Sequence, residues 1–293
     1  MSEDVASIER VCAAIAARCA RGEISPAIAL MEMLIASEDL ARVRAAVSAA
    51  GDERLAALLV AHEAGAARVA TMLRSDVDVP PQGGSVEEGV AFCKHLFDWS
   101  VRQSEEASVA LYSLGSPALL EAATAEIVQL LDTWRLLGPR RRALDIGCGI
   151  GRMEVALASR LGRIDAIDVS AGMIDAARRR CAGLANVHLA LASGLDLASF
   201  ADGTFDLVLA VDTFPYLVQS GMPLVTTHVV EAARVLAPRG DLVVLNFSYR
   251  DDTARDVADV TALARAAGME VVSSGTRPFA LWNGVAFHLR RGA

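Results

Sequence analysis

The segment Leu144–Gly151 reads Leu-Asp-Ile-Gly-Cys-Gly-Ile-Gly and decides the fold of this 293-residue chain. It overlaps the short apolar run Ala143–Ile146, which predicts a buried strand, and it precedes a helical stretch at residues 153–161. Glycines at a turn from strand to helix let the backbone approach a ligand closely, and the free N–H groups at the start of the helix attract negative charge. We therefore expect a nucleotide-like ligand at the carboxyl edge of a sheet.

Short apolar runs alternate with helical stretches from this segment to the C-terminus. Such alternation predicts an α/β domain with a parallel sheet that helices cover on both faces. The predicted strands are residues 143–146, 164–168, 187–191, 207–211, 242–247, 269–273 and 285–289. The predicted helices between them include residues 171–182, 224–236 and 257–267.

The strand after the glycine turn ends in Asp168, 21 residues past Gly147. A carboxylate at this position can accept hydrogen bonds from ribose hydroxyls, and two cofactor classes use this geometry. Dinucleotide-binding folds have the pattern GxGxxG, whereas the third glycine here comes one position early and Arg152 stands where that pattern has Gly or Ala. The pattern therefore favours S-adenosylmethionine, which has no pyrophosphate and only an amino-acid carboxylate.

Four stretches of the chain form an ordered series: Leu144–Gly151, Ile167–Met173, Phe205–Val208 and Glu231–Leu242. The series resembles the first motif, the ribose-binding turn, the strand-four signature and the helix and turn before strand five of the class I S-adenosylmethionine-dependent methyltransferase family, especially its small-molecule branch. The resemblance extends from about Tyr112 to the C-terminus. It implies a seven-stranded, mostly parallel sheet with an antiparallel final hairpin and helices on both faces, preceded here by an all-α domain.

The resemblance also implies which residues hold the cofactor. Asp145 would lie with the glycines of the turn at the methionine end, Asp168 would bind the ribose hydroxyls and Met173 would pack on the adenine. The family usually has an acid for the adenine amino group where this chain has Ser193, whose hydroxyl is the substitute. The predicted cofactor-binding residues are Tyr112, Asp145, Gly147, Cys148, Gly149, Gly151, Asp168, Val169, Met173, Ser193, Gly194 and Val211.

The methyl acceptor is expected over the carboxyl ends of the fourth and fifth predicted strands. Methyl transfer from a sulfonium is an in-line displacement, so alignment and exclusion of water supply much of the acceleration. Asp212 is a candidate to remove a proton or orient a hydroxyl or amine, with capping of the next turn as the alternative. Tyr216 and Tyr249 are further candidate catalytic residues, against ordinary packing, and Arg250 is a candidate to bind a substrate carboxylate, against a solvated loop position.

The chain is predicted to have four parts. Residues 1–76 form a helical N-terminal domain that acts as a lid or a dimerisation surface. Residues 77–85 combine Pro-Pro with Gly-Gly without periodicity and form a linker. Residues 86–115 form a connecting helix and a segment that covers the cofactor with Tyr112, and residues 116–293 form the S-adenosylmethionine-binding domain.

One N-terminal helix carries more apolar surface than a single face needs. Ser25 supplies an N-cap and Pro26 the first helical position, and residues 27–36 are apolar on most sides. Such a helix must be covered by other helices or by a partner chain. A homodimer through the N-terminal helices is therefore one expectation.

Composition excludes several classes of partner. The formal net charge of −8 gives no overall field that attracts a phosphate backbone, so we predict no nucleic-acid partner. No apolar run reaches the roughly 18 residues of a membrane span and the acidic opening Met1–Asp4 is unlike a secretory signal, so we predict a cytoplasmic protein without a membrane partner. The five cysteines have no metal-ligand spacing, which predicts reduced thiols and no metal.

These observations together predict an S-adenosylmethionine-dependent methyltransferase that acts on an O, N or C atom of a small-molecule acceptor. One alternative is a macromolecular methyltransferase, on RNA or a protein, with the helical segment as its docking module; salt-sensitive binding to RNA would favour it. Another is a partner protein that binds the cofactor without transferring a methyl group.

Overall fold

The computed structural model describes residues 2–75 and 84–293, and the chain divides into two compact units. The first, called here the helical unit, consists of Met1–Asp78, Ser100–Glu126 and Phe279–Asn283. The second, called the sheet unit, consists of Val79–Trp99, Ile127–Pro278 and Gly284–Ala293. The predicted linker lies outside the described residues as far as residue 83.

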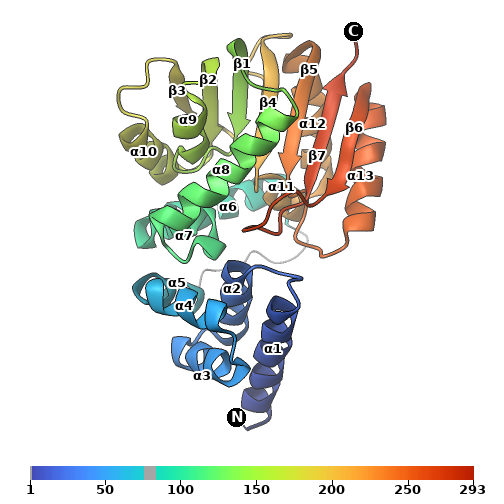
Figure 1. Cartoon of the computed structure of the whole chain (residues 1–293). Helices are drawn as coiled ribbons and strands as arrows, with labels where there is room; N and C mark the ends of the chain where they lie inside the picture. The colour runs from blue at the N-terminus through green and yellow to red at the C-terminus, as the bar shows by residue number, and fades with distance from the viewer. Residues whose placement is uncertain (1, 76–83) are drawn as a thin grey trace. The chain divides into compact units, whose positions relative to one another are not determined.

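The helical unit begins with five short helices (Figure 1). They are α1 (Ser2–Ala20), α2 (Pro26–Ser37), α3 (Leu40–Ala50), α4 (Glu53–Ala61) and α5 (Glu63–Leu73), followed later by α7 (Glu105–Val109) and the 3-10 turn η1 (Leu111–Ser113). Side chains of Ser25, Asp39 and Asp52 accept hydrogen bonds from first-turn amides and so begin α2, α3 and α4. Among the described residues no single helix is long and apolar enough to cross a membrane, and α4 with α5 meets that test only as a pair bent by 82°.

Helix α2 explains the apolar excess of residues 27–36. It packs against α1, α3, α4 and α5, and its residues from Ala27 to Leu30, with Met33 and Leu34, are buried. The chain itself therefore supplies the cover that the sequence requires. A homodimer through these helices stays a prediction, and the burial of α2 within the chain does not require one.

The segment between the last two strands also belongs to the helical unit. In this segment, residues 279–283, the backbone N–H of Leu281 donates to the carboxylate of Glu126, and the Leu281 carbonyl accepts a hydrogen bond of 2.8 Å from the Ser25 hydroxyl. The indole of Trp282 is only 4% exposed. Polar and apolar contacts therefore both hold this segment among the helices.

The sheet unit is built on a seven-stranded sheet with the order β3-β2-β1-β4-β5-β7-β6. Strand β7 runs antiparallel to β5 and β6, and the other neighbours are parallel. This confirms the predicted sheet and its antiparallel final hairpin. The strands are β1 (Gly138–Ile146), β2 (Leu161–Asp168), β3 (Val187–Leu191), β4 (Phe205–Val211), β5 (Leu236–Leu245), β6 (Met269–Thr276) and β7 (Ala286–Arg291).

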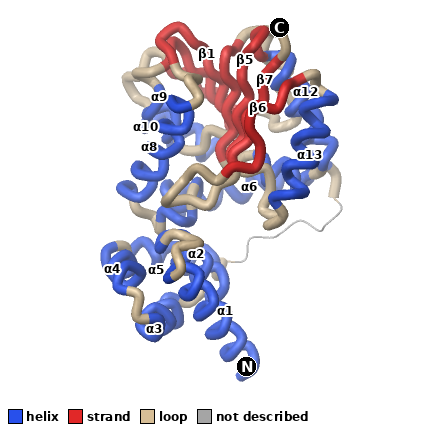
Figure 2. The backbone as a smooth tube through the Cα atoms, turned by 45° about the vertical axis from the view of Figure 1, so that its right-hand side comes forward, coloured by secondary structure: helices blue, strands red, loops and turns tan. Residues whose placement is uncertain are grey.

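Helices cover both faces of the sheet (Figure 2). Helices α9 (Arg152–Leu157) and α10 (Ala171–Arg180) lie on one face, and α12 (Met222–Val235) and α13 (Thr253–Ala266) lie on the other. The remaining helices are α6 (Val86–Gln103), α8 (Pro117–Thr133) and α11 (Phe214–Ser220). Because parallel strands are joined through these helices, the carboxyl ends of β1, β2, β4 and β5 come together at one edge.

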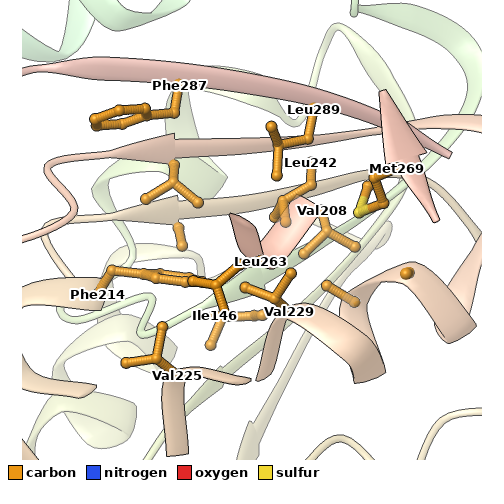
Figure 3. Packing of buried hydrophobic residues seen from close by; sticks show 14 of the residues in the cluster. Ile146, Val208, Phe214, Val225, Val229, Leu242, Leu263, Met269, Phe287 and Leu289 are labelled. Atoms are coloured by element: carbon orange, nitrogen blue, oxygen red, sulfur yellow. The ribbon is translucent and has the colours of Figure 1, made fainter. Parts of the chain in front are cut away.

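A cluster of buried side chains fills the space between the sheet and helices α11 to α13 (Figure 3). The rings of Phe214, Phe247 and Phe287 follow one another in it, with centroids 6.0 Å and 6.2 Å apart. Burying a side chain of this size contributes about 1.5–3 kcal/mol. Because Phe214 and Phe247 come shortly after β4 and β5, this core fixes the loops that follow the two strands.

Candidate cofactor and active site

The glycine turn joins β1 to α9. Gly147, Gly149 and Gly151 all have left-handed backbone, with φ of 76°, 54° and 78°. A Cβ atom at Gly147 would lie 2.3 Å from the Oγ1 atom of Thr213, and one at Gly151 would lie 3.1 Å from the Cα atom of Ala177 in α10. The turn therefore needs glycine for its backbone conformation and for close packing against two other segments.

Asp168 ends β2 and lies beside the glycine turn. Its two carboxylate oxygens accept hydrogen bonds of 2.9 Å from the backbone N–H groups of Gly149 and Ser170. Burial raises the pKa of the Asp168 carboxyl group, and the backbone donors oppose that rise. The structure thus brings the predicted ribose-binding acid into direct contact with the predicted cofactor turn.

Asp98 on α6 also belongs to this region, and sequence reasoning missed it. Its Oδ1 atom accepts hydrogen bonds from the Ser170 hydroxyl (2.6 Å) and from the Gly172 N–H (2.9 Å). Ser170 in turn caps α10 by accepting from the Met173 N–H. Asp98 therefore holds the loop after β2. No motif marks it, because its partners lie 72 and 74 residues away.

A pair of acids lies under the glycine turn. Asp145 on β1 is 4% exposed and Glu154 on α9 is 0% exposed, and their carboxyl groups face one another. The Oδ1 atom of Asp145 and both carboxyl oxygens of Glu154 are buried without a hydrogen-bond donor among the described residues. Burial raises the pKa of Asp145 to about 6 and raises that of Glu154 well above its ordinary value. Glu154 is a second residue that sequence reasoning missed.

A strained pair of polar residues follows β4 and β5. Asp212 and Asn246 have left-handed backbone, with φ of 56° and 62°. The Asn246 side-chain amide donates to the Oδ1 atom of Asp212 at 2.7 Å, and its oxygen accepts from the Val285 N–H at 2.9 Å. Such backbone costs of order 1–3 kcal/mol in non-glycine residues and clusters at functional sites. No sequence signal marks Asn246, because the predicted strand at residues 242–247 includes it, whereas β5 ends at Leu245.

Asp212 has a carboxyl group with one engaged and one open oxygen. The Tyr249 hydroxyl donates to the same Oδ1 atom at 3.1 Å, so both side-chain donors use one oxygen, and Oδ2 accepts no hydrogen bond from any described residue. Burial raises the pKa of the Asp212 carboxyl group, while the Asn246 donor, the charge of Arg152 and the Tyr249 donor lower it. This leaves Oδ2 as a proton acceptor for another molecule.

Aromatic rings stand next to Asp212. The Tyr216 ring meets the Tyr249 ring edge to face at 5.9 Å and the Phe97 ring edge to face at 4.8 Å. Burial, and then the charge of Asp212, raise the pKa of Tyr216, which keeps its hydroxyl protonated. The structure therefore brings together the three residues that the sequence proposed for catalysis, Asp212, Tyr216 and Tyr249.

Arg250 has other partners than the sequence suggested. Its guanidinium group donates to Asp256 and Asp259 on α13 and to the Ser248 hydroxyl, and it lies 5.8 Å from the centre of the Phe247 ring. These bonds engage the Nε and Nη2 atoms of the guanidinium group. Arg250 therefore holds the loop after β5 on α13, and its candidate role in binding a substrate carboxylate stays a prediction.

This structural role of Arg250 can be tested by replacing it with alanine. We expect Arg250→Ala to lower the free energy of unfolding by about 1–2 kcal/mol, because buried Asp256 loses its charged partner. S-Adenosylhomocysteine affinity should stay unchanged in calorimetry. Arg255→Ala, on the same helix, serves as the control in thermal denaturation. An unchanged melting temperature would contradict this structural role.

Several other residues predicted to bind the cofactor make contacts away from the glycine turn. Val169 and Gly194 approach each other closely, since a Cβ atom at Gly194 would lie 2.5 Å from the Val169 side chain. The Ser193 hydroxyl accepts a hydrogen bond from the Leu195 N–H, within its own turn. Tyr112 belongs to the helical unit, where its ring stacks on Trp282 at 6.0 Å.

Residues 143–240, which carry the glycine turn, Asp168 and Asp212, match the family model described as a methyltransferase domain. The sheet unit contains this match to the methyltransferase-domain family and has the strand order of the class I methyltransferase fold. The four motifs predict a methyltransferase domain with this fold, and the match to the family model and the strand order agree with that prediction. Such methyltransferases use S-adenosylmethionine as their cofactor.

Known proteins resemble this domain over part of their length. The chain is 34% identical over 123 residues to 2-methyl-6-phytyl-1,4-hydroquinone methyltransferase from Synechocystis sp., which covers 42% of this chain and 36% of that protein. It is 30% identical over 177 residues to demethylmenaquinone methyltransferase from Clavibacter sepedonicus, which covers 60% of this chain and 63% of that protein. The chain thus spans less than two thirds of each of these relatives.

A solved structure shares the fold. Phosphoethanolamine N-methyltransferase 1 from Haemonchus contortus, in complex with phosphoethanolamine and S-adenosylhomocysteine, superposes with a TM-score of 0.58 at 18% identity. The match covers 72% of this chain and 50% of that one. At this identity it supports the fold of the methyltransferase domain.

Proposed function

We propose that this protein binds S-adenosylmethionine at the glycine turn and transfers its methyl group to a small-molecule acceptor beside Asp212. The observation that carries the proposal is the carboxyl group of Asp145, which is buried under the turn and whose Oδ1 atom accepts no hydrogen bond from a described N–H group. A buried polar atom of this kind is costly unless a partner satisfies it. The α-ammonium group of the cofactor's methionine end is such a partner.

The remaining residues also fit this cofactor. The carboxylate of Asp168 stands at the end of the next strand, where ribose hydroxyls can donate to it, and its bond to the Gly149 N–H keeps turn and acid together. When bound, the cofactor supplies an electrophilic methyl group on a sulfonium. The chain contributes alignment of that group and a low-polarity setting in which the displacement is not slowed by water.

Asp212 is proposed to act on the acceptor. Its free Oδ2 atom can take a proton from a hydroxyl or amine, or orient that group, while Asn246 and Tyr249 hold Oδ1. The rings of Tyr216 and Tyr249 provide flat apolar surface for a ring-containing acceptor. The names of two relatives, which give a hydroquinone and demethylmenaquinone as substrates, support this choice of acceptor.

The proposal is tested with labelled S-adenosylmethionine and a panel of hydroquinones, phenols and amines. We expect S-adenosylhomocysteine to bind in calorimetry and label to reach at least one acceptor. Asp212→Asn should lower turnover about 10²- to 10⁴-fold because the base is lost, while cofactor affinity stays within about threefold.

Asp251→Asn is the matched control for that variant. Asp251 also has left-handed backbone and lies exposed in the loop after β5, so its amide form should turn over at the wild-type rate. Binding without transfer to any acceptor would favour the partner-protein alternative. Full turnover by Asp212→Asn would remove Asp212 from the chemistry.

A further inference from the structure

The carboxyl group of Glu154 has no role in the proposed methyl transfer, and yet it is fully buried. It lies on α9, one turn after the glycine segment, and it faces the carboxyl group of Asp145. Neither of its oxygens receives a hydrogen bond from a described donor. Two facing carboxyl groups can bond to each other only if one of them carries a proton.

The charges around the pair leave room for a single negative charge. Arg152 on α9 faces both acids and is the one cation that acts on both of them among the described residues. Asp168 on β2 adds negative charge near Asp145, and the thiols of Cys148 and Cys181 face Glu154. Burial raises the pKa of both thiols, so they stay neutral. A second ionised carboxylate would therefore be uncompensated, which is strongly unfavourable in a buried site.

The geometry points to Glu154 as a neutral acid that donates its proton to Asp145 and so positions the Asp145 carboxylate for the cationic amino group of the cofactor. This inference rests on the proposed function. A carboxylate has about four lone-pair sites, so one bond from Glu154 leaves Asp145 able to accept from a ligand. Glu154 is thus a positioning residue, which acts through Asp145 and touches no substrate.

The assignment has a consequence for pH. Burial raises the pKa of Asp145 to about 6, so Asp145 is ionised at pH 7.5 and gains a proton as the pH falls through about 6. The pair then carries two protons and no charge, and its attraction for an ammonium group is lost. We expect S-adenosylhomocysteine to bind more weakly at pH 5 than at pH 7.5 by about tenfold or more.

The direct test compares Glu154→Gln with Glu154→Ala. A glutamine amide donates to Asp145 as a protonated glutamate does, so Glu154→Gln should bind S-adenosylhomocysteine within about threefold of the wild type at pH 7.5. Glu154→Ala removes the donor and should bind at least about tenfold more weakly. Calorimetry on the full chain gives both dissociation constants.

Infrared spectroscopy supplies a readout that packing alone would not change. The wild type at pH 7.5 should show the carbonyl band of a protonated carboxyl group, and Glu154→Gln should lack it. Glu231→Gln is the control, because the hydrogen bond from Arg234 lowers the pKa of Glu231 and keeps it ionised. That substitution should remove no such band and should leave ligand affinity unchanged.

The outcomes separate the two proposals. Absence of ligand binding by the wild type would overturn the proposed function, while the infrared band would still report the state of Glu154. A wild type that binds the ligand but shows no band lost in Glu154→Gln, or a Glu154→Gln variant that binds more than tenfold worse, would overturn the inference about Glu154.

Discussion

Asp168→Ala is expected to weaken S-adenosylhomocysteine binding by more than tenfold. Hydrogen bonds to a charged group are worth about 1.5–3 kcal/mol, and each 1.4 kcal/mol is a factor of ten in affinity. The variant also removes the acceptor for the Gly149 and Ser170 N–H groups, which orders the glycine turn. The measurement is isothermal titration calorimetry, with circular dichroism to show that the chain stays folded.

Asp165→Ala is the control for this experiment. Asp165 lies on the same strand and is bonded by the guanidinium group of Arg163, away from the glycine turn. Its removal should leave the dissociation constant unchanged. If Asp168→Ala bound the ligand as tightly as the wild type, Asp168 would have no place in the site.

Gly147→Ala is expected to lower the free energy of unfolding by about 3 kcal/mol. A left-handed backbone costs an L-residue roughly 1–2 kcal/mol, and overpacking adds about 1–3 kcal/mol. The added methyl group would collide with Thr213, whose hydroxyl donates to the Ile146 carbonyl at 2.7 Å. Urea denaturation gives the change, and ligand affinity should fall as the turn is displaced.

A double variant separates the collision from the backbone cost. Thr213→Ala alone removes one hydrogen bond and should cost about 1 kcal/mol. In the double variant, Thr213→Ala also removes the atoms that the new methyl group would meet. The double variant should therefore lose less free energy of unfolding than the two single variants lose together. If the losses in free energy of unfolding were strictly additive, Thr213 would not restrict Gly147. A Gly147→Ala variant as stable as the wild type would contradict the geometry of the turn.

The strands were predicted best where apolar runs define both ends. Residues 187–191 form β3 as the periodicity indicated. Strand β1 begins at Gly138, five residues before its predicted start, through the polar stretch Pro139–Arg142. Its first residue pairs with Leu161 on β2, so a contact between strands, which no local pattern encodes, adds these residues to the sheet.

Strand β5 shows the same effect at a turn-like sequence. The residues from Leu236 to Gly240 read as a turn, yet Leu236 pairs with Phe205 and the strand begins there. The sequence does not predict helix α11, because seven residues are too few to show a helical period. Pro215 lies in its first turn, where proline is common, but one proline does not by itself indicate a helix.

The residues of the site also fall into those that the sequence indicates and those that only the structure shows. Gly147 and Asp168 could be proposed from their spacing at two strand ends, and Asp145 from the family resemblance. Asp98 and Asn246 could not, because each acts through a side chain whose partner comes from another element. The roles of the N-terminal domain as a lid or dimerisation surface, and of Tyr112 as a cofactor cover, stay predictions.

The segment at residues 279–283 makes the helical unit more than a removable appendage. The Leu281 carbonyl accepts a hydrogen bond from Ser25, which begins a helix near the opposite end of the sequence, and the Trp282 ring stacks on Tyr112. A recombinant fragment starting after the first five helices would lack Ser25 and would leave the Leu281 carbonyl without this donor. Expression and screening should therefore use the full length.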